Sequence, residues 1–168
     1  FVLKLDSNGN FIWAKSFGND SSNWGQSIIC DSENNLYITG FFSNTVDFDP
    51  SENVSNLISN GQSDIFILKL DTLGDFIFAN SMGGSSSDWA YSISFDNLNN
   101  LLLTGKFYGN SDFDPETTSF LLTPNGQDDV FIVKLSSTTL SVFENTVDKI
   151  LNIYPNPTTE FINLKLDD

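Results

Sequence analysis

The apolar residues of this chain fall into short runs, and clusters of polar turn residues separate one run from the next. FVLKLD at residues 1–6 places Phe1, Leu3 and Leu5 on one face of an extended strand. Similar runs follow in FIWAKSF, QSIICD and NLYITGFF, which are rich in β-branched and aromatic residues. No helical periodicity of useful length occurs before residue 143. The pattern predicts an all-β protein.

These runs recur with a period of 65 residues. FVLKLD at 1–6 returns as FILKLD at 66–71 and as FIVKLS at 131–136. When residues 1–65 are aligned with residues 66–130, no gap is needed and 32 of the 65 positions are identical. An internal repeat of this length indicates stacked copies of one supersecondary unit.

Each repeat contains four short strands closed by tight hairpins. D-x-x-G at 6–9 and 71–74 suits a type I turn that ends on a glycine with positive φ, and DSENN and DNLNN provide the second hairpin of each repeat. Four antiparallel strands at a fixed period are typical of a β-propeller blade. The period exceeds the ~40–50 residues of common blades, and the excess lies in polar stretches at 43–63 and 108–128. We expect a long inserted loop in each blade.

The repeated motifs resemble the bacterial SBBP repeats, a family of β-propeller blades. The resemblance rests on W-x-x-S-I-x-x-D-x-x-N-N-L-x-x-T-G-x-F, then DFDP, then NGQ-x-D-x-F-I-x-K-L-D-x-x-G-x-F, and it covers residues 1 to about 143. It implies that QSIICD is the innermost strand of a blade, followed by NLYITGFF, the F-x-x-K-L strand and an outermost strand. It also implies a half blade at 1–18, a full blade at 24–82 and a terminal blade at 89–143. We expect the sheet of the full blade to pack face to face on the sheet of the terminal blade, as part of an incomplete propeller.

The pattern changes after the third repeat begins to decay. Residues 144–150 form a polar linker, and the following IYPNPT precedes an alternating apolar run. This segment resembles the start of the β-sandwich-like type A sorting domain that type IX secretion recognises, with Tyr154, Pro155, Asn156 and Pro157 as the sorting motif. The resemblance implies a truncated sorting domain at 151–168, and it implies the type IX machinery as a partner. The alternative is a proline-rich turn ahead of an ordinary edge strand.

Composition excludes several classes of function. The chain has 168 residues, 22 acidic residues against 7 lysines, a net charge of -15, and neither arginine nor histidine. Without histidine, no Ser-His-Asp or Cys-His nucleophile is available. A charge of this sign repels nucleic acid and anionic membranes, and no apolar run approaches the ~18 residues that span a bilayer. We therefore expect no nucleic-acid partner and no membrane insertion.

Two further expectations concern the ends of the chain and its single cysteine. The chain starts inside one β pattern at Phe1 and stops inside another, so we interpret it as part of a longer protein. Cys30 has no second cysteine for a disulfide. We expect it to be a small buried apolar residue in the run SIIC, because no nearby base or cation would activate its thiol.

The DFDP motif is the candidate for metal chemistry. Asp47 and Asp49, and likewise Asp112 and Asp114, lie on the same side of an extended segment and offer oxygen ligands to Ca²⁺. Calcium prefers ~6–8 oxygens, whereas two aspartates supply at most four. We therefore favour a structural role, in which the phenylalanine anchors the loop and the aspartates accept backbone N–H bonds. An acid/base pair for glycoside hydrolysis is disfavoured, because a catalytic site is normally present once and DFDP repeats.

Two tryptophans are weak candidates for ligand binding. Trp24 and Trp89 begin the innermost strands, where they would stack on sugar rings. A packing role between blades is more common for such residues, and we favour it for both. Neither the ligand nor the total number of blades follows from the sequence.

These observations predict a non-catalytic binding or adhesion protein, secreted or held on the outer surface of a Gram-negative bacterium. Its partner would be an extracellular glycan or protein. The alternative is a substrate-binding accessory of a secreted, polysaccharide-acting enzyme whose catalytic domain lies outside this sequence. Fold alone does not decide between them.

Overall fold

The computed structural model of the chain describes residues 1–115 and 118–136. These residues form thirteen β-strands and no helix, which confirms the all-β prediction. The predicted linker at 144–150 and the predicted sorting segment with Tyr154, Pro155, Asn156 and Pro157 lie outside the described residues. No helix suited to crossing a bilayer is found in the part that is described.

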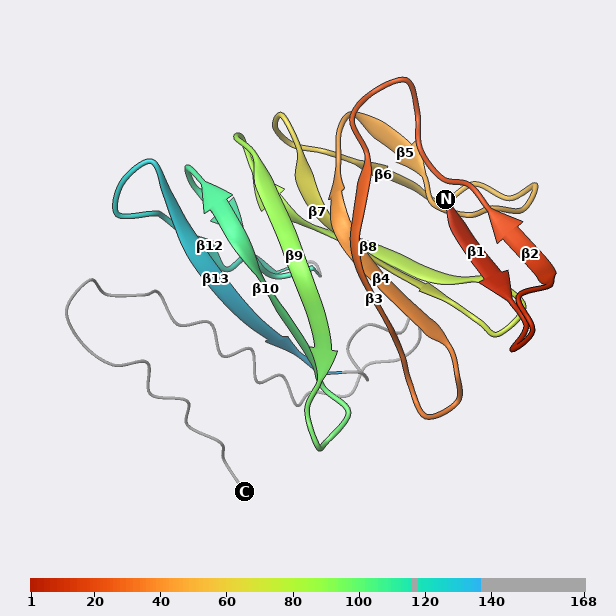
Figure 1. Cartoon of the computed structure of the whole chain (residues 1–168). Helices are drawn as coiled ribbons and strands as arrows, with labels where there is room; N and C mark the ends of the chain where they lie inside the picture. Colours follow the sequence, from red (N-terminus) through yellow and green to blue (C-terminus); the bar gives the residue numbers. More distant parts are fainter. Residues whose placement is uncertain (116–117, 137–168) are drawn as a thin grey trace.

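One complete blade follows the predicted strand order. It consists of β3 (Trp24–Cys30), β4 (Leu36–Phe42), β7 (Asp64–Leu70) and β8 (Phe76–Gly84). Each strand pairs antiparallel with the next, so that chain order is also the order across the sheet (Figure 1). The repeat therefore folds as one β-meander.

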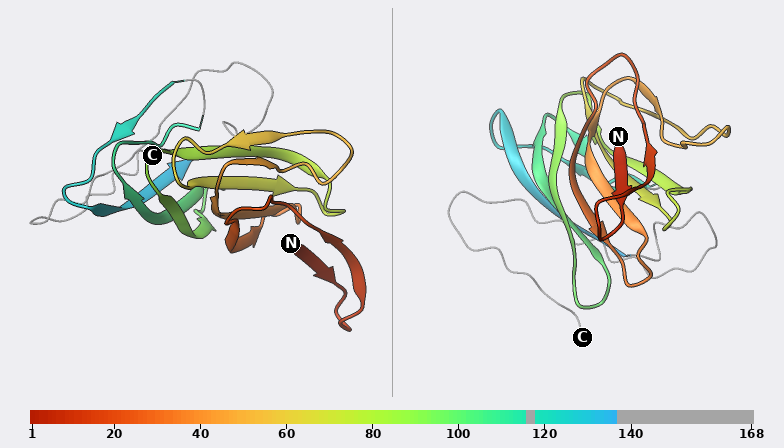
Figure 2. Two further views of the ribbon diagram at one scale, coloured as in Figure 1. Left: turned by 90° about the horizontal axis from the view of Figure 1, so that it is seen from above. Right: turned by 45° about the vertical axis from the view of Figure 1, so that its right-hand side comes forward.

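Parts of two further blades flank this one. On one side, β1 (Val2–Leu5) and β2 (Phe11–Lys15) form a hairpin. On the other side, β9 (Asp88–Phe95), β10 (Leu101–Tyr108) and β13 (Asp128–Leu135) form a three-stranded antiparallel sheet. The views in Figure 2 show the hairpin at one end of the stack and the three-stranded sheet at the other. The described chain is thus a β-propeller-like arrangement of successive blades.

The inserted loops contain short strands that the sequence did not predict. β5 (Thr45–Asp47) pairs with β6 (Asn56–Ile58), and β11 (Ser111–Asp112) pairs with β12 (Leu121–Leu122). β11 also pairs with β8, which extends the expected four-stranded sheet to six strands. Glycine permits this contact, because a Cβ on Gly84 would lie 1.9 Å from the backbone oxygen of Asn110.

Four hairpins lie at the end of the blades opposite to the inserted loops, and they share one geometry. In each, the Oδ1 of an aspartate accepts the N–H groups two and four residues later; these residues are Asp6, Asp31, Asp71 and Asp96. The residue three positions after the aspartate, such as Gly9 or Asn34, has a positive φ. The turns predicted from D-x-x-G and from the Asn-Asn pairs are therefore confirmed.

The recurring Thr-Gly pair has a structural cause in both copies. The Thr39 hydroxyl donates to the backbone oxygen of Phe66 at 2.7 Å, and a Cβ on Gly40 would lie 1.8 Å from the backbone oxygen of Trp24. Gly105 meets the oxygen of Trp89 in the same way, at 1.9 Å. No side chain fits there, so the pair fixes the inner strands of each blade.

One of the two buried apolar clusters in the described residues lies in the interface between the two larger sheets, as predicted, and the other lies on the opposite face of the complete blade, where Val2 packs against it. Tyr37, Ile65 and Ile67 of the complete blade pack with Ile93 and Leu103 of the terminal blade in one buried cluster. We call this interface the seam. The expectation for Cys30 was wrong, because this residue is exposed. Its neighbour Ile29 packs against the seam, so Cys30 lies on the opposite face of β3; there the half blade packs over the neighbouring strands and leaves Cys30 exposed.

Candidate ligand-binding loop face

The long loops of successive repeats gather at one end of the blades. We call this end the loop face; it consists of residues 18–23, 43–63, 83–87 and 109–127, of which 116 and 117 are not described. Hydrogen bonds join its segments: the Asn19 side chain donates to the backbone oxygens of Ser43 and Thr45, each at 2.8 Å. Between successive repeats, the Gln62 N–H donates to the Ser86 oxygen at 2.9 Å. Hydrogen bonds therefore join the loop segments both within one repeat and between two repeats.

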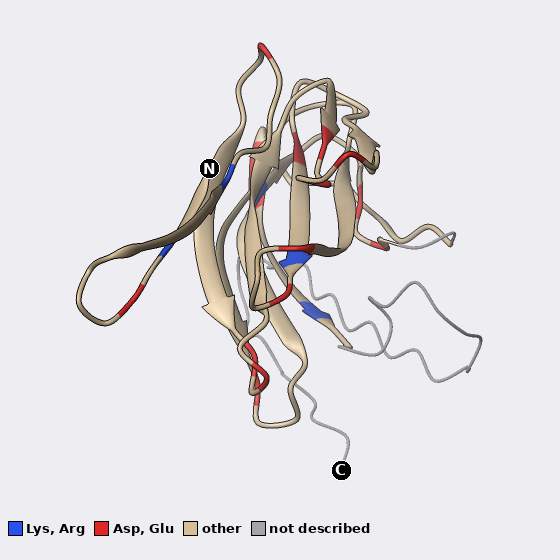
Figure 3. Cartoon of the chain, turned by 90° about the vertical axis from the view of Figure 1, so that its right-hand side faces the viewer, with Lys and Arg blue, Asp and Glu red and all other residues tan. Residues whose placement is uncertain are grey.

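The loop face is acidic. The described residues of its four segments include six aspartates and glutamates and no lysine. Figure 3 shows acidic positions in these loops, whereas the described lysines lie on strands. Such a face repels anionic ligands and favours neutral polar or cationic groups.

The DFDP aspartates are used inside their own loops. Asp47 Oδ1 accepts the N–H of Asp49 at 3.0 Å and that of Ser55 at 2.8 Å. Asp112 Oδ1 accepts the N–H groups of Asp114 and Phe120 in the same way, at 3.0 and 2.8 Å. These bonds are the ones predicted for a structural role.

The phenylalanine of each motif is the anchor that the sequence predicted. Phe48 is 3% exposed and Phe113 is 0% exposed. Phe48 contacts the rings of Phe42 and Phe66, and Phe113 contacts their counterparts in the next repeat. Burying a ring of this size ties each inserted loop to its blade.

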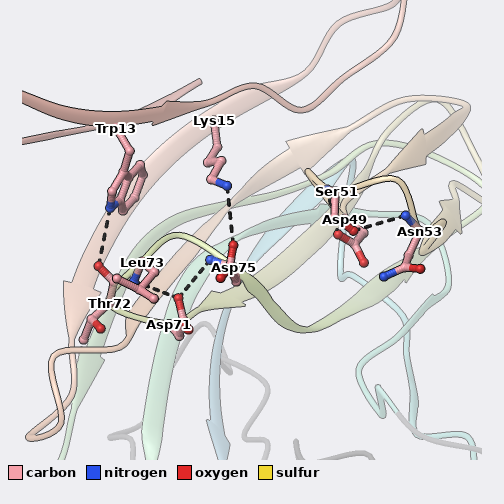
Figure 4. Close-up of polar contacts among 9 residues, drawn as sticks. All are labelled: Trp13, Lys15, Asp49, Ser51, Asn53, Asp71, Thr72, Leu73 and Asp75. Carbon is pink, nitrogen blue, oxygen red and sulfur yellow. Dashed lines mark hydrogen bonds and ion pairs between the residues drawn. The ribbon is translucent and has the colours of Figure 1, made fainter.

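The second aspartate of each motif also bonds within its loop. Asp49 accepts the Ser51 N–H at 2.9 Å, and the Ser51 hydroxyl accepts the Asn53 N–H at 3.1 Å (Figure 4). Asp114 accepts the Thr118 hydroxyl. Among the described residues, no group of three or more His, Cys, Asp or Glu is placed to share a metal ion. Calcium binding by Asp47, Asp49, Asp112 and Asp114 stays the disfavoured alternative to the structural role, and these contacts do not test it.

The structure reveals a recess that the sequence did not predict. It has a volume of about 260 Å³ and lies over β8, between the insertions of two successive repeats. Leu57 and Asn60 come from one insertion, Asp112 and Asp114 from the other, and Asn80 from the floor. The volume is below the ~300–1,000 Å³ of drug-sized pockets, so the recess suits one sugar ring or one side chain. Only the pairing of β11 with β8 brings these residues together.

The two tryptophans do not line this recess, and their environments differ. Trp89 is half-buried in the seam; it contacts the Phe41 ring at 5.4 Å, and its indole N–H donates to the Ser63 hydroxyl at 2.7 Å. The packing role predicted for Trp89 is confirmed. Trp24 is 60% exposed and stacks on Phe41 of its own blade at 6.3 Å, so in the described residues the expected packing between blades is wrong for Trp24.

Comparison with known proteins agrees with the fold. The chain is 28% identical over 117 residues to an uncharacterised WD repeat-containing protein of Acanthamoeba polyphaga mimivirus. The match covers 61% of this chain and 8% of the viral protein. WD repeats are propeller blades, and the relative therefore supports a β-propeller repeat protein. No protein-family model matches the chain, and no solved structure matches it.

Proposed function

We propose that this chain is part of a non-catalytic β-propeller that binds its ligand on the loop face. The observation that carries the proposal is the recess formed where the insertions of two repeats meet over β8. The aspartates that repeat from blade to blade hold turns and loops, so they serve the scaffold rather than a reaction. The viral WD-repeat relative supports a scaffold of this type.

The chemistry of the recess favours a neutral, hydroxyl-rich ligand such as a glycan. Asn60, Asn80 and Ser81 offer amide and hydroxyl groups that both donate and accept hydrogen bonds. Leu57 adds apolar contact of the kind that the face of a sugar ring uses. The acidic charge of the loop face disfavours sulfated or phosphorylated ligands.

A panel of immobilised glycans tests this proposal, with neutral and sulfated versions of each. We expect binding to neutral glycans and not to sulfated ones. Asn60→Ala should weaken that binding at least about tenfold, equivalent to ~1.4 kcal/mol. Asn125→Ala is the matched control, since Asn125 occupies the same repeat position outside the recess. Equal losses in both variants, or binding that depends on sulfate, would contradict the recess as the site.

The proposal extends to export and to a surface location. Its support is the YPNP motif in the sequence at 154–157, which resembles a type IX sorting domain. The test is to express the longest natural form of the protein in its host, with and without everything after Phe143. We expect the truncated form to accumulate in the periplasm, whereas unchanged surface display would contradict a sorting role. A catalytic domain elsewhere in that longer form would favour the accessory role instead.

A further inference from the structure

Two aspartates from neighbouring blades are buried together in the seam. Asp64 begins β7 and Asp88 begins β9, and both are 0% exposed. The backbone holds them at this place: the Asp88 N–H donates to the Ser63 oxygen at 2.8 Å, and Ser63 forms a parallel bridge with Ser87. Burying two carboxylates without a cation is costly, so their charge state affects how the blades pack.

The two carboxyl groups have unequal hydrogen-bond partners. Asp88 accepts three donors: the N–H of Gly84 at 2.8 Å, the N–H of Tyr108 at 3.1 Å and the hydroxyl of Ser111 at 2.8 Å. Asp64 Oδ2 accepts the Asn60 N–H at 3.0 Å. Asp64 Oδ1, in contrast, is buried and has no hydrogen-bond partner among the described residues. Three donors stabilise the ionised form of Asp88, and none of the three donates to Asp64 Oδ1.

The unpartnered oxygen lies close to the other carboxyl group. A Cβ on Gly83 would be 2.8 Å from Asp64 Oδ1 and 2.9 Å from Asp88 Oδ2, so both oxygens lie against the same glycine. Gly83 has a φ of +154°, and any side chain there would collide with Asp64. The glycine therefore preserves the approach of the two carboxyl groups.

No other charge on the neighbouring elements compensates this pair. β4 and β8 flank β7 and carry no ionisable side chain at this end. On the side of β10 and β11, Lys106 donates to the Tyr108 hydroxyl and pairs with Asp128, while Asp112 caps its own loop. None of the described lysines is paired with Asp64 or Asp88.

We propose that Asp64 is protonated beside the ionised Asp88 carboxylate, and that this buried pair is a pH-sensitive latch between the two blades. With Asp64 protonated and Asp88 ionised, the two neighbouring carboxyl groups carry one net charge instead of two. Burial, and then the neighbouring charge of Asp88, raise the pKa of Asp64 to about 7, and burial also raises the pKa of Asp88. A cation fits less well, because the groups aimed at this pair include the N–H donors of Asn60, Gly84 and Tyr108, whereas Ca²⁺ requires ~6–8 oxygens.

The sign of the pH effect follows from the raised pKa. Asp64 binds its proton more tightly in the folded protein than in the unfolded chain, where the pKa is 3.8. The stabilisation is therefore complete below the unfolded pKa and is lost as the pH rises through about 7. Above that pH both groups are ionised and repel each other across the seam. The chain has no histidine, so no other side chain ordinarily titrates between about pH 5 and 8.

The preceding repeat has a neutral residue at one position of this pair. Asn23 occupies the position of Asp88 in the preceding repeat, and its Oδ1 accepts the Ser43 N–H at 3.4 Å as Asp88 accepts that of Tyr108. An amide thus fits where the carboxylate stands. Asp129 occupies the position of Asp64 in the following repeat and accepts the Asn125 N–H at 2.8 Å, but no described residue faces it as Asp88 faces Asp64.

The test measures unfolding of the 168-residue chain as a function of pH. We expect the denaturation midpoint of the wild type to fall between about pH 5 and 7 and to level off at higher pH, and that of Asp64→Asn to stay constant over this window. Asp129→Asn is the matched control and should retain the wild-type dependence. A flat wild-type profile, or an equal loss of pH dependence in both variants, would overturn the latch.

A direct titration keeps the proposal testable should Asp64→Asn fail to fold. The carboxyl carbon of Asp64, followed by ¹³C NMR in the folded wild-type chain, should titrate with a midpoint near neutral pH. A midpoint near the ordinary ~4 would overturn the proposal. If added Ca²⁺ stabilised the wild type at alkaline pH but not Asp64→Asn, the result would show that a cation, and not a proton, neutralises the pair.

Discussion

The inner strands β3 and β9 have similar sequences but lie in opposite surroundings. Ile28 and Ile93 are equivalent residues of the repeat, yet Ile28 is 54% exposed and Ile93 is 5% exposed. β9 faces the complete blade across the seam, whereas the corresponding face of β3 is open in the described residues. The pair shows that the burial of an inner strand is decided by the neighbouring blade and not by the strand's own sequence.

Contacts within a blade, in contrast, are reproduced from copy to copy. Lys134 pairs with Asp96 at 2.8 Å, and the equivalent Lys69 pairs with Asp31 at 3.5 Å. The half blade departs from this pattern, because Lys4 donates instead to the backbone oxygen of Thr72 at 2.7 Å. Figure 4 shows a similar adaptation nearby, with Trp13 donating to Thr72 and Lys15 pairing with Asp75. The lysine is thus kept at this position of each repeat, but its hydrogen-bond partner differs in the half blade.

The largest effect expected from this comparison comes from truncating the two isoleucines. Ile93→Ala should lower the free energy of unfolding by about 3 kcal/mol, because it leaves a cavity in the seam. Ile28→Ala should lower it by less than about 1 kcal/mol, because the side chain is already largely in water. Urea denaturation of both variants measures the difference. Losses of equal size would mean that β3 is covered as well as β9.

A smaller effect should distinguish the lysines by its dependence on pH. Lys134→Met should cost about 1 kcal/mol at neutral pH, where Asp96 is ionised. Hydrogen bonds, the largest from Lys134, hold the pKa of Asp96 below its usual value of 3.8. The contribution is therefore present above that value and declines as the pH falls toward the folded pKa. The loss in Lys4→Met should not change over this range, because its acceptor is a carbonyl; urea titrations at neutral and acid pH compare the two.

Features local to one repeat were predictable from the sequence, and features shared between repeats were not. The strands, the four hairpins and the anchoring of Phe48 and Phe113 follow from patterns within 65 residues, the resemblance to SBBP repeats implied the order of the strands, and the structure confirms them. The six-stranded sheet, the recess and the exposure of Cys30 depend on which element a neighbouring blade supplies. Asp64 and Asp88 lie 24 residues apart in different strands, and no motif marks them as a pair. A signal was available in the Asn-to-Asp change between positions 23 and 88.

The smallest effect concerns the open face itself. Phe95, the counterpart of Cys30, contacts the Tyr37 ring at 5.1 Å across the seam, whereas Cys30 is exposed. A thiol reagent should therefore modify Cys30 in the native chain at nearly the rate seen in denaturant, and the modified chain should keep its denaturation midpoint. Phe95→Cys in a Cys30→Ser background is the matched control, because a thiol at that position lies in the seam and should react far more slowly. Protection of Cys30 in the native chain would show that its face is covered. In that case both inner strands would be packed, and they would differ only in which element covers them.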